Sequence, residues 1–266
     1  MSARGVDFSD AKQADEYMQR IGVEYKFGCN SEHDAAACHY LGEWLDAYKR
    51  QRHDAYRTFH TNCHKRNFPA SCFKLGRFLM NGIPAEGDAE AIHRDTTAAY
   101  DAFRKGCDGR IADSCVYAGQ LEFYGDEQNR QRSPAAGMAT MRRCCEQLQH
   151  GLCCFFLSTW YLGDRRRRRR RAKAPNDASE RAATVDAASA ETERAVPSVA
   201  EDMQRALEYG VRACELGEAQ ACANVSRMYR LGDGVDKDAR KADEYKQMAL
   251  DIVHNVQHNL TVSAQG

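Results

Sequence analysis

Cysteines occur in pairs at one recurring spacing, and this feature restricts the fold of the chain more than any other. The two cysteines of a pair enclose seven or eight residues. Each second cysteine opens the same pattern, Cys-x-x-apolar-small, as in CHYLG and CFKLG. The pairs that share this register are Cys29–Cys38, Cys63–Cys72, Cys107–Cys115, Cys145–Cys154 and Cys214–Cys222. The pattern therefore predicts about five copies of one structural unit.

The second cysteines also define the length of that unit. They follow one another at intervals of 34, 43, 39 and 68 residues. The last interval contains a compositionally biased segment, roughly residues 164–197, and is 34 residues long without it. Periods of roughly 34 to 47 residues are typical of solenoids built from helical repeats.

Helical periodicity on both sides of each pair indicates a two-helix unit. Ala55, Phe59 and Cys63 lie four residues apart, on one stripe of a helix that ends near the cysteine. In a single straight helix, cysteines eight or nine residues apart would have Cα atoms about 12–13 Å apart, whereas a disulfide needs them within about 7 Å. Pairing therefore requires the chain to fold back between the cysteines, so that the second cysteine begins a second helix.

A disulfide between the two helices is the preferred interpretation of each pair. Zinc sites usually contain closely spaced Cys-x2–4-Cys knuckles, which this chain lacks. Buried free thiols are the other alternative, because free cysteine often serves as a small core residue. We assign no catalytic residue and no metal site.

The fourth repeat departs from the pattern because its cysteines are doubled. The helical stripe through Met141 selects Cys145, and hence the bridge Cys145–Cys154, with Cys144–Cys153 as the alternative. Adjacent residues of a helix point about 100° apart, so we expect only one of these bridges to form. Cys144 and Cys153 are then candidate free thiols, either inert or able to take part in redox chemistry or to bind a soft metal such as copper.

Charge and hydropathy exclude several classes of function. The chain has 38 basic and 38 acidic residues, but seven of the arginines form one run, Arg165–Arg171, so the remainder carries 38 − 7 − 38 = −7. We therefore expect no nucleic-acid interface. There is no stretch of about 20 apolar residues, which predicts no membrane span, and the N-terminal residues lack the features of a secretory or mitochondrial presequence. The arginine-containing segment is poor in large apolar residues and is expected to be a disordered surface insertion.

The last repeat carries a family resemblance. Residues 222–249 read CANVSRMYRLGDGVDKDARKADEYKQMA and resemble a Sel-1-like repeat. The matching positions are Tyr229, Gly232, Gly234, Val235, Asp238, Lys241, Ala242, Tyr245 and Ala249. With a cysteine late in one helix and early in the next, the chain resembles the cysteine-rich, β-lactamase hcp-like branch of the family that includes mitochondrial assembly factors of cytochrome c oxidase. Val6 to Phe8, the first cysteine pair and CFKLG also fit that group.

The resemblance implies an all-α fold, a right-handed α-solenoid of about five disulfide-stapled Sel-1-like, TPR-like repeats. We expect repeats one to four in residues 1–163, the insertion in 164–197, the fifth repeat with a C-terminal helix in 198–258, and a tail in 259–266. The resemblance also implies a soluble, monomeric protein of the mitochondrial intermembrane space, retained there by oxidation of its cysteines.

In that setting the chain would bind protein partners during assembly of respiratory complex IV, and also of complex I. The main hypothesis is a disulfide-stabilised scaffold. The alternative is a thiol–disulfide reductase or haem-binding protein that supports maturation of the copper sites of the oxidase. The axial haem ligands would then be sought among His39, His64, Met80 and Met228, although no Cys-x-x-Cys-His motif is present.

One further motif is attributed to chance. Ser71 and Lys74 match the Ser-x-x-Lys pattern of serine β-lactamases, but neither Ser-Asp-Asn nor Lys-Thr-Gly accompanies it. The repeat pattern already accounts for the residues between and beside them.

Overall fold

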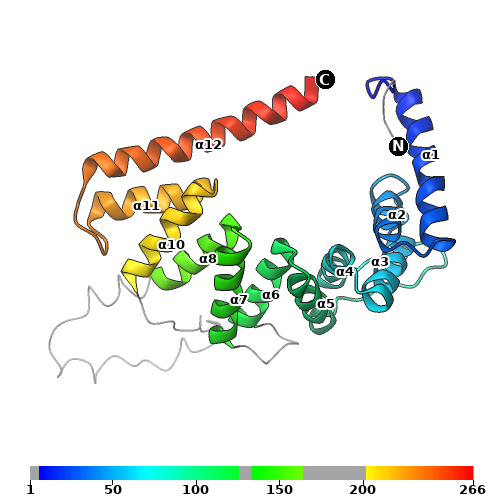
Figure 1. Cartoon of the computed structure of the whole chain (residues 1–266), viewed down its shortest axis with the longest axis horizontal. Helices are drawn as coiled ribbons and strands as arrows, with labels where there is room; N and C mark the ends of the chain where they lie inside the picture. The colour runs from blue at the N-terminus through cyan, green and yellow to red at the C-terminus, as the bar shows by residue number, and fades with distance from the viewer. Residues whose placement is uncertain (1–5, 126–132, 164–201, 266) are drawn as a thin grey trace, which may run out of the picture. The chain divides into compact units, whose positions relative to one another are not determined.

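The computed structural model describes residues 6–125, 133–163 and 202–265, with side chains as far as residue 256. These residues form eleven α-helices and no strand beyond two isolated β-bridges, and they are labelled as in Figure 1. The helices are α1 (Ala11–Asn30), α2 (Ala35–Ala47), α3 (Arg52–Arg66), α4 (Pro69–Asn81), α5 (Thr96–Asp108), α6 (Ala112–Tyr124), α7 (Pro134–Gln147), α8 (Gly151–Leu162), α10 (Met203–Glu215), α11 (Ala219–Leu231) and α12 (Ala239–Gln265). The predicted fold class, an all-α solenoid of disulfide-stapled helix pairs, is confirmed.

The helices form two compact units. The first contains α1 to α6, which are three helix pairs that pack in chain order, each helix against the next. The second begins at Ser133 and contains α7, α8, α10, α11 and most of α12. In this unit α8 packs against both α7 and α10, and α10 packs against α11. Residues 164–201, including the run Arg165–Arg171 and the whole predicted insertion 164–197, lie outside the described residues.

Local sequence signals define the ends of the helices. The first helix of most repeats begins at a side-chain cap that accepts hydrogen bonds from free backbone N–H groups, as a helix N-terminus requires. These caps are Asp10, Asp95, Ser133 and Asp202. The second helix of repeats two to five ends at a glycine with a positive φ of 65–71°, namely Gly82, Gly125, Gly163 and Gly232. Glycine adopts this conformation without the strain that a Cβ would cause.

The turn inside every repeat contains one residue in the left-handed region. These residues are His33, Asn67, Arg110, Gln149 and Gly217, with φ between 50° and 90°. Each lies five positions before the second, in-register cysteine of its repeat. One left-handed residue reverses the chain, and the two helices then run antiparallel with their cysteines face to face.

Neighbouring repeats approach closely at the small residue of the Cys-x-x-apolar-small pattern. A Cβ built on Gly42 would lie 2.5 Å from the ring of Phe59 in the next repeat, and one on Gly76 would lie 2.6 Å from the ring of Phe103. In the second unit a serine takes this place. Ser158 donates a hydrogen bond to the carbonyl of Ala206 at 2.7 Å, so α8 is joined directly to α10.

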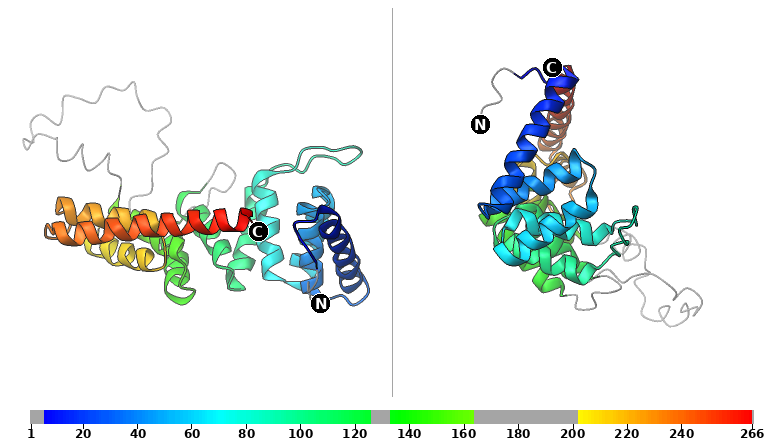
Figure 2. Two further views of the ribbon diagram at one scale, coloured as in Figure 1. Left: turned by 90° about the horizontal axis from the view of Figure 1, so that it is seen from above. Right: turned by 90° about the vertical axis from the view of Figure 1, so that its right-hand side faces the viewer.

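Two segments extend this regular arrangement. The loop of residues 82–95 between α4 and α5 projects from the helices (Figure 2) and is held by pairing of Ile83 with Ile92. Helix α12 continues through Gln265, so residues 259–265, expected as a tail, are helical in the structure. Neither proline nor glycine occurs between Ala239 and Gln265 to end that helix. None of the described helices is long and apolar enough to cross a membrane.

Candidate functional site

Six disulfides join the paired helices, and every cysteine of the chain is bridged. Five of them link the cysteines that share the repeat register, with Cα–Cα distances of 4.5–4.9 Å. These are Cys29–Cys38, Cys63–Cys72, Cys107–Cys115, Cys145–Cys154 and Cys214–Cys222. All twelve cysteines are at most 7% exposed, so the bridges lie inside the helix pairs.

The sixth bridge corrects the expectation for the doubled cysteines. Cys144 and Cys153 are not free thiols but are joined to each other, beside the bridge Cys145–Cys154. The angle of 100° between adjacent residues applies within one helix and does not take the facing helix into account. Both helices of the pair carry two adjacent cysteines, and their turn places Cys144 opposite Cys153 as well as Cys145 opposite Cys154. The Cα atoms of Cys144 and Cys153 are 5.9 Å apart, within the range of disulfides although wider than in the other five.

A histidine lies next to this sixth bridge. His150 is the N-cap residue of α8, three positions before Cys153. Its ring nitrogen and the sulfur atoms of Cys144 and Cys153 all lie within 4.8 Å of one another. Sequence reasoning did not single out His150, because its position relative to Cys144 depends on the turn between α7 and α8.

A buried polar network surrounds Ser71 in the first unit. The side-chain amide of Asn62 donates to the Ser71 hydroxyl oxygen at 2.8 Å, and His39 Nδ1 lies 3.1 Å from the same oxygen. His39 Nε2 lies 3.8 Å from a carboxylate oxygen of Glu43. Burial lowers the pKa of His39, and the nearby Glu43 opposes that effect.

The order serine, histidine, carboxylate resembles a hydrolytic triad, but the geometry does not provide a reaction site. Ser71 is fully buried and its oxygen already accepts a hydrogen bond from Asn62. Lys74 of the Ser-x-x-Lys motif is paired with Glu43 at 2.7 Å. We therefore interpret this network as a structural link between α2, α3 and α4.

The candidate haem ligands also have structural surroundings. The His39 ring packs near Phe59 and Phe68. His64 is exposed, and its Nδ1 lies 3.2 Å from Nζ of Lys105. Met228 is fully buried. Met80 is half-buried and packs against the core cluster that contains Phe59, so each of the four side chains has protein neighbours.

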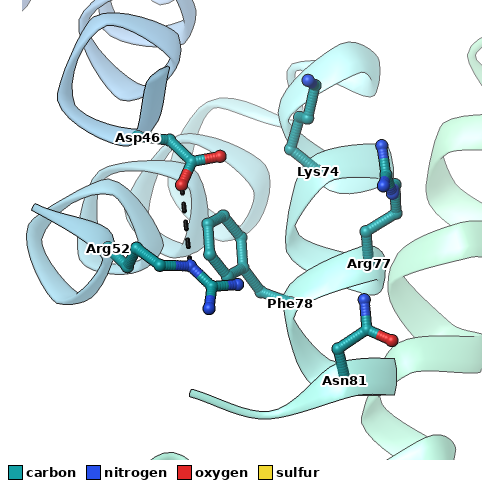
Figure 3. A pocket seen from close by; sticks show the side chains of 6 residues that line it. All are labelled: Asp46, Arg52, Lys74, Arg77, Phe78 and Asn81. Carbon is teal, nitrogen blue, oxygen red and sulfur yellow. Dashed lines mark ion pairs between the residues drawn. The ribbon is translucent and has the colours of Figure 1, made fainter. Parts of the chain in front are cut away.

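A polar pocket opens at the surface where α2, α3 and α4 meet (Figure 3). Its lining residues are Asp46, Arg52, Lys74, Arg77, Phe78 and Asn81. Arg52 is paired with Asp46 at 3.7 Å and lies over the ring of Phe78 at 5.4 Å. Three lining side chains are cationic and one is anionic, so the lining carries a net positive charge, reduced where Lys74 pairs with Glu43. Such a pocket is suited to an acidic side chain or a carboxylate.

A second buried acidic residue, Glu122, has a structural role. Glu122 of α6 is 5% exposed and accepts hydrogen bonds from Tyr100 and Arg104 of α5, both at 2.9 Å. Burial and the bond to Glu122 raise the pKa of Tyr100 to about 12. This group fixes α5 on α6, because removing one partner would leave a buried charge unpaired.

The chain is similar to known proteins along nearly its whole length. It is 28% identical over 262 residues to a protein of Drosophila melanogaster named cytochrome c oxidase assembly factor 7 homolog, covering 98% of this chain and 97% of the relative. It is 28% identical to cytochrome c oxidase assembly factor 7 of Xenopus tropicalis over 96% of this chain and 95% of that protein, and to that of Homo sapiens over 93% and 92%. The resemblance to this group, inferred above from the cysteine-containing repeats, is confirmed. No protein-family model matches the sequence.

Solved structures support the fold. A Sel1 repeat protein from Oxalobacter formigenes superposes with a TM-score of 0.59 at 16% identity, covering 90% of this chain and 83% of that one. A protective antigen of uropathogenic Escherichia coli with an SLR fold superposes with a TM-score of 0.56 at 15% identity, over 90% of this chain and 47% of the antigen. At these identities the likeness concerns the fold alone.

Proposed function

Because the chain resembles cytochrome c oxidase assembly factors over nearly its entire length, we propose that it acts in the assembly of respiratory complex IV. The similarity extends across both units rather than one repeat, which supports a shared role. Complex I is a second client that the same role would include. The observation that carries the proposal is this full-length similarity combined with a fold in which every repeat is stapled.

We propose that the chain works as a binding scaffold. Helical solenoids present long surfaces to partners and need no reacting group. The serine, histidine and glutamate side chains that most resemble catalytic groups are committed to structural contacts, as in the network around Ser71. Rigid pairing of helices favours binding, because a preorganised surface loses little conformational freedom when a partner docks.

The intermembrane space of mitochondria is the location we propose. Twelve bridged cysteines require surroundings in which thiols are oxidised, and such bridges are rare in the cytosol. The relatives are named as factors for a mitochondrial enzyme. Oxidation after import would lock the helix pairs and retain the folded chain.

The pocket between α2, α3 and α4 is the contact site that we propose for a partner. Its excess of positive charge fits an acidic segment, and Arg77 lies exposed at its edge. Arg77→Glu reverses one charge there and should weaken binding of assembly partners. Lys246→Glu makes the same charge change on the exposed surface of α12 and serves as the matched control.

Depletion followed by rescue tests the proposed function. Cells that lack the chain should accumulate less mature complex IV on native gels, and re-expression of the unchanged chain should restore it. Rescue by Arg77→Glu should be weaker than rescue by Lys246→Glu at equal protein level. Normal complex IV after complete depletion would refute the assembly role, and equal rescue by both variants would refute the pocket as the contact site.

A thiol–disulfide reductase is the second candidate, favoured by one observation. The bridge Cys144–Cys153 is additional to the bridge that each repeat needs, so it is the pair available for exchange. Alkylation of the native protein during mild reduction would separate the two candidates. Rapid labelling at Cys144 and Cys153, with turnover of a disulfide substrate, supports the reductase, whereas a protein that stays unlabelled is a scaffold only.

A further inference from the structure

The bridge Cys144–Cys153 is redundant for holding its helix pair together. The other four repeats have one bridge each, and Cys145–Cys154 already joins α7 to α8 at the usual place. A second cross-link one residue away removes little further freedom from the unfolded chain. Opening Cys144–Cys153 would therefore leave α7 and α8 stapled.

Opening this bridge would place two thiols beside a third ligand. The sulfur atoms of Cys144 and Cys153 and a ring nitrogen of His150 all lie within 4.8 Å of one another. In the part of the chain that the structure describes, this is the one group of three or more cysteine, histidine or carboxylate ligands that meets so tight a limit. Two thiolates and one imidazole form a soft ligand set, which selects thiophilic ions such as Cu(I) and Zn(II).

The backbone spacing at this pair suits metal ligation. Two sulfur ligands at about 2.3 Å from a tetrahedral metal ion are about 3.8 Å apart, wider than the S–S bond of a disulfide. The Cα atoms of Cys144 and Cys153 are 5.9 Å apart, against 4.9 Å for the neighbouring pair Cys145 and Cys154. The additional 1 Å gives the sulfurs room to separate while the retained bridge holds the helices.

The surroundings are those of an enclosed site. Both cysteines are fully buried, and His150 is half-buried at the start of α8. A Cβ on Gly151 would lie 2.7 Å from the side chain of Glu218, so this acid of the fifth repeat lies against the same turn. Carboxylates beside ligating histidines commonly orient the ring and raise its affinity for metal.

We propose that Cys144, His150 and Cys153 form a redox-gated site for one thiophilic closed-shell cation, Cu(I) or Zn(II). In the oxidised chain both sulfurs are consumed in the bridge and the site cannot bind metal. This site would form whether or not the chain acts in the assembly of complex IV, because its three ligands all belong to the fourth repeat.

The gating reaction needs a thiol as reductant. Two thiol groups of a low-molecular-weight or protein dithiol reduce the Cys144–Cys153 bond to two cysteine thiols and are themselves oxidised to a disulfide. Binding of the cation then displaces the two cysteine protons to solvent, because the ligands are thiolates. His150 supplies its neutral ring nitrogen and undergoes no change in oxidation state.

Staged reduction of the full-length protein under anaerobic conditions tests the proposal. The oxidised protein is exposed to increasing dithiothreitol, and trapping by alkylation with peptide mapping reports which bridges open. At the stage where Cys144–Cys153 is open, the reductant is removed. Cu(I), supplied as its acetonitrile complex, is then titrated against bicinchoninate in one arm, and Zn(II) against a chromogenic chelator in the other.

We expect Cys144–Cys153 to open first and the chain then to take up one equivalent of metal in at least one arm. The double variant Cys144→Ser with Cys153→Ser should abolish that uptake, and His150→Gln should weaken it by at least about tenfold. Cys63→Ser with Cys72→Ser removes a bridge of repeat two, in the first unit, and should leave uptake unchanged. Circular dichroism and the remaining disulfide map establish that each variant is folded.

Three outcomes would overturn the site. One is opening of Cys144–Cys153 together with or after the other bridges. The second is no metal uptake in either arm once the bridge is open. The third is uptake that His150→Gln and the Cys144→Ser with Cys153→Ser variant leave intact, since metal would then lie elsewhere.

Discussion

The ring of Phe59 in α3 occupies the space that a side chain at Gly42 of α2 would need. A methyl group at Gly42 would approach the ring Cε1 atom to 2.5 Å, and Phe59 itself is fully buried. Gly76 and Phe103 repeat this relationship between the next two helices. Within the first unit, each repeat therefore joins the next by a glycine against an aromatic ring.

This relationship predicts that Gly42→Ala destabilises the protein. Because the buried ring has to move, the free energy of unfolding should fall by about 1–3 kcal/mol, as overpacked cores show. Urea denaturation followed by circular dichroism would measure the change. In a Phe59→Leu background the same substitution should cost less, because the shorter side chain leaves room for the methyl group. An equal cost in both backgrounds would mean that the ring is not the obstacle.

The left-handed residue in each turn gives a second prediction. Gly217 has a φ of 90°, and a Cβ there would meet no atom within 4 Å. Gly217→Ala should therefore lower the free energy of unfolding by about 1–2 kcal/mol through backbone strain alone. Gly217→Asn should cost less, because asparagine tolerates this region and Asn67 holds the equivalent place in repeat two. Thermal denaturation of both variants checks this order, and a more stable alanine variant would contradict it.

Much of this architecture could be predicted because a disulfide requires the Cα atoms of its two cysteines to lie close together. A pair such as Cys63 and Cys72 cannot be joined unless the chain reverses between them, so the bridge implies the helix–turn–helix. The small residue after each second cysteine likewise indicated close approach of helices. What spacing could not show was the partner of that small residue, since Phe59 belongs to the following repeat.

The grouping of Cys144, His150 and Cys153 could not be predicted from the sequence. Because Cys144 and Cys145 are adjacent on one helix, they were expected to exclude each other from forming a bridge. The facing helix also carries two adjacent cysteines, Cys153 and Cys154, and both bridges form. The sequence also did not show which residue adopts the left-handed conformation in each turn, because Arg110 and Gln149 are not residue types that favour it. The cross-linked helix ends impose that conformation on whichever residue occupies the position.

The buried His39 predicts a dependence of stability on pH. Burial holds its pKa below the ordinary 6.5, so the folded protein binds fewer protons than the unfolded chain once the pH falls below that value. The contribution of His39 is thus constant above about pH 7 and becomes unfavourable as the pH falls through 6.5. The pKa of His64, which is only partly covered, is also lowered, by desolvation and by the adjacent positive charge of Lys105, and adds a loss of the same sign.

Urea denaturation of the unchanged protein and of His39→Gln between about pH 7.5 and 5.5 would measure this effect. Glutamine keeps a polar group near Ser71 but does not titrate, so the variant should lose less stability over the interval. His254→Gln, an exposed histidine of α12, serves as the control and should not change the slope. A His39→Gln slope equal to that of the unchanged protein would show that His39 titrates alike in both states.

A bridge that is alone in its repeat should stabilise the protein more than the additional bridge Cys144–Cys153 of repeat four. Replacing both Cys63 and Cys72 by alanine removes the only cross-link of repeat two, and the chain-entropy relation gives a loss of about 2.5 kcal/mol for so short a loop. Replacing Cys144 and Cys153 by alanine removes the same atoms, also from fully buried positions, but leaves the Cys145–Cys154 bridge in place. The two variants therefore leave cavities of the same kind, and the difference in their free energies of unfolding reports the effect of the cross-link.

We expect the Cys144→Ala with Cys153→Ala variant to lose clearly less stability than the Cys63→Ala with Cys72→Ala variant in urea denaturation under oxidising conditions. Equal losses would mean that each bridge of the doubled pair constrains the chain independently, and the fourth repeat would then have no redundant bridge to open.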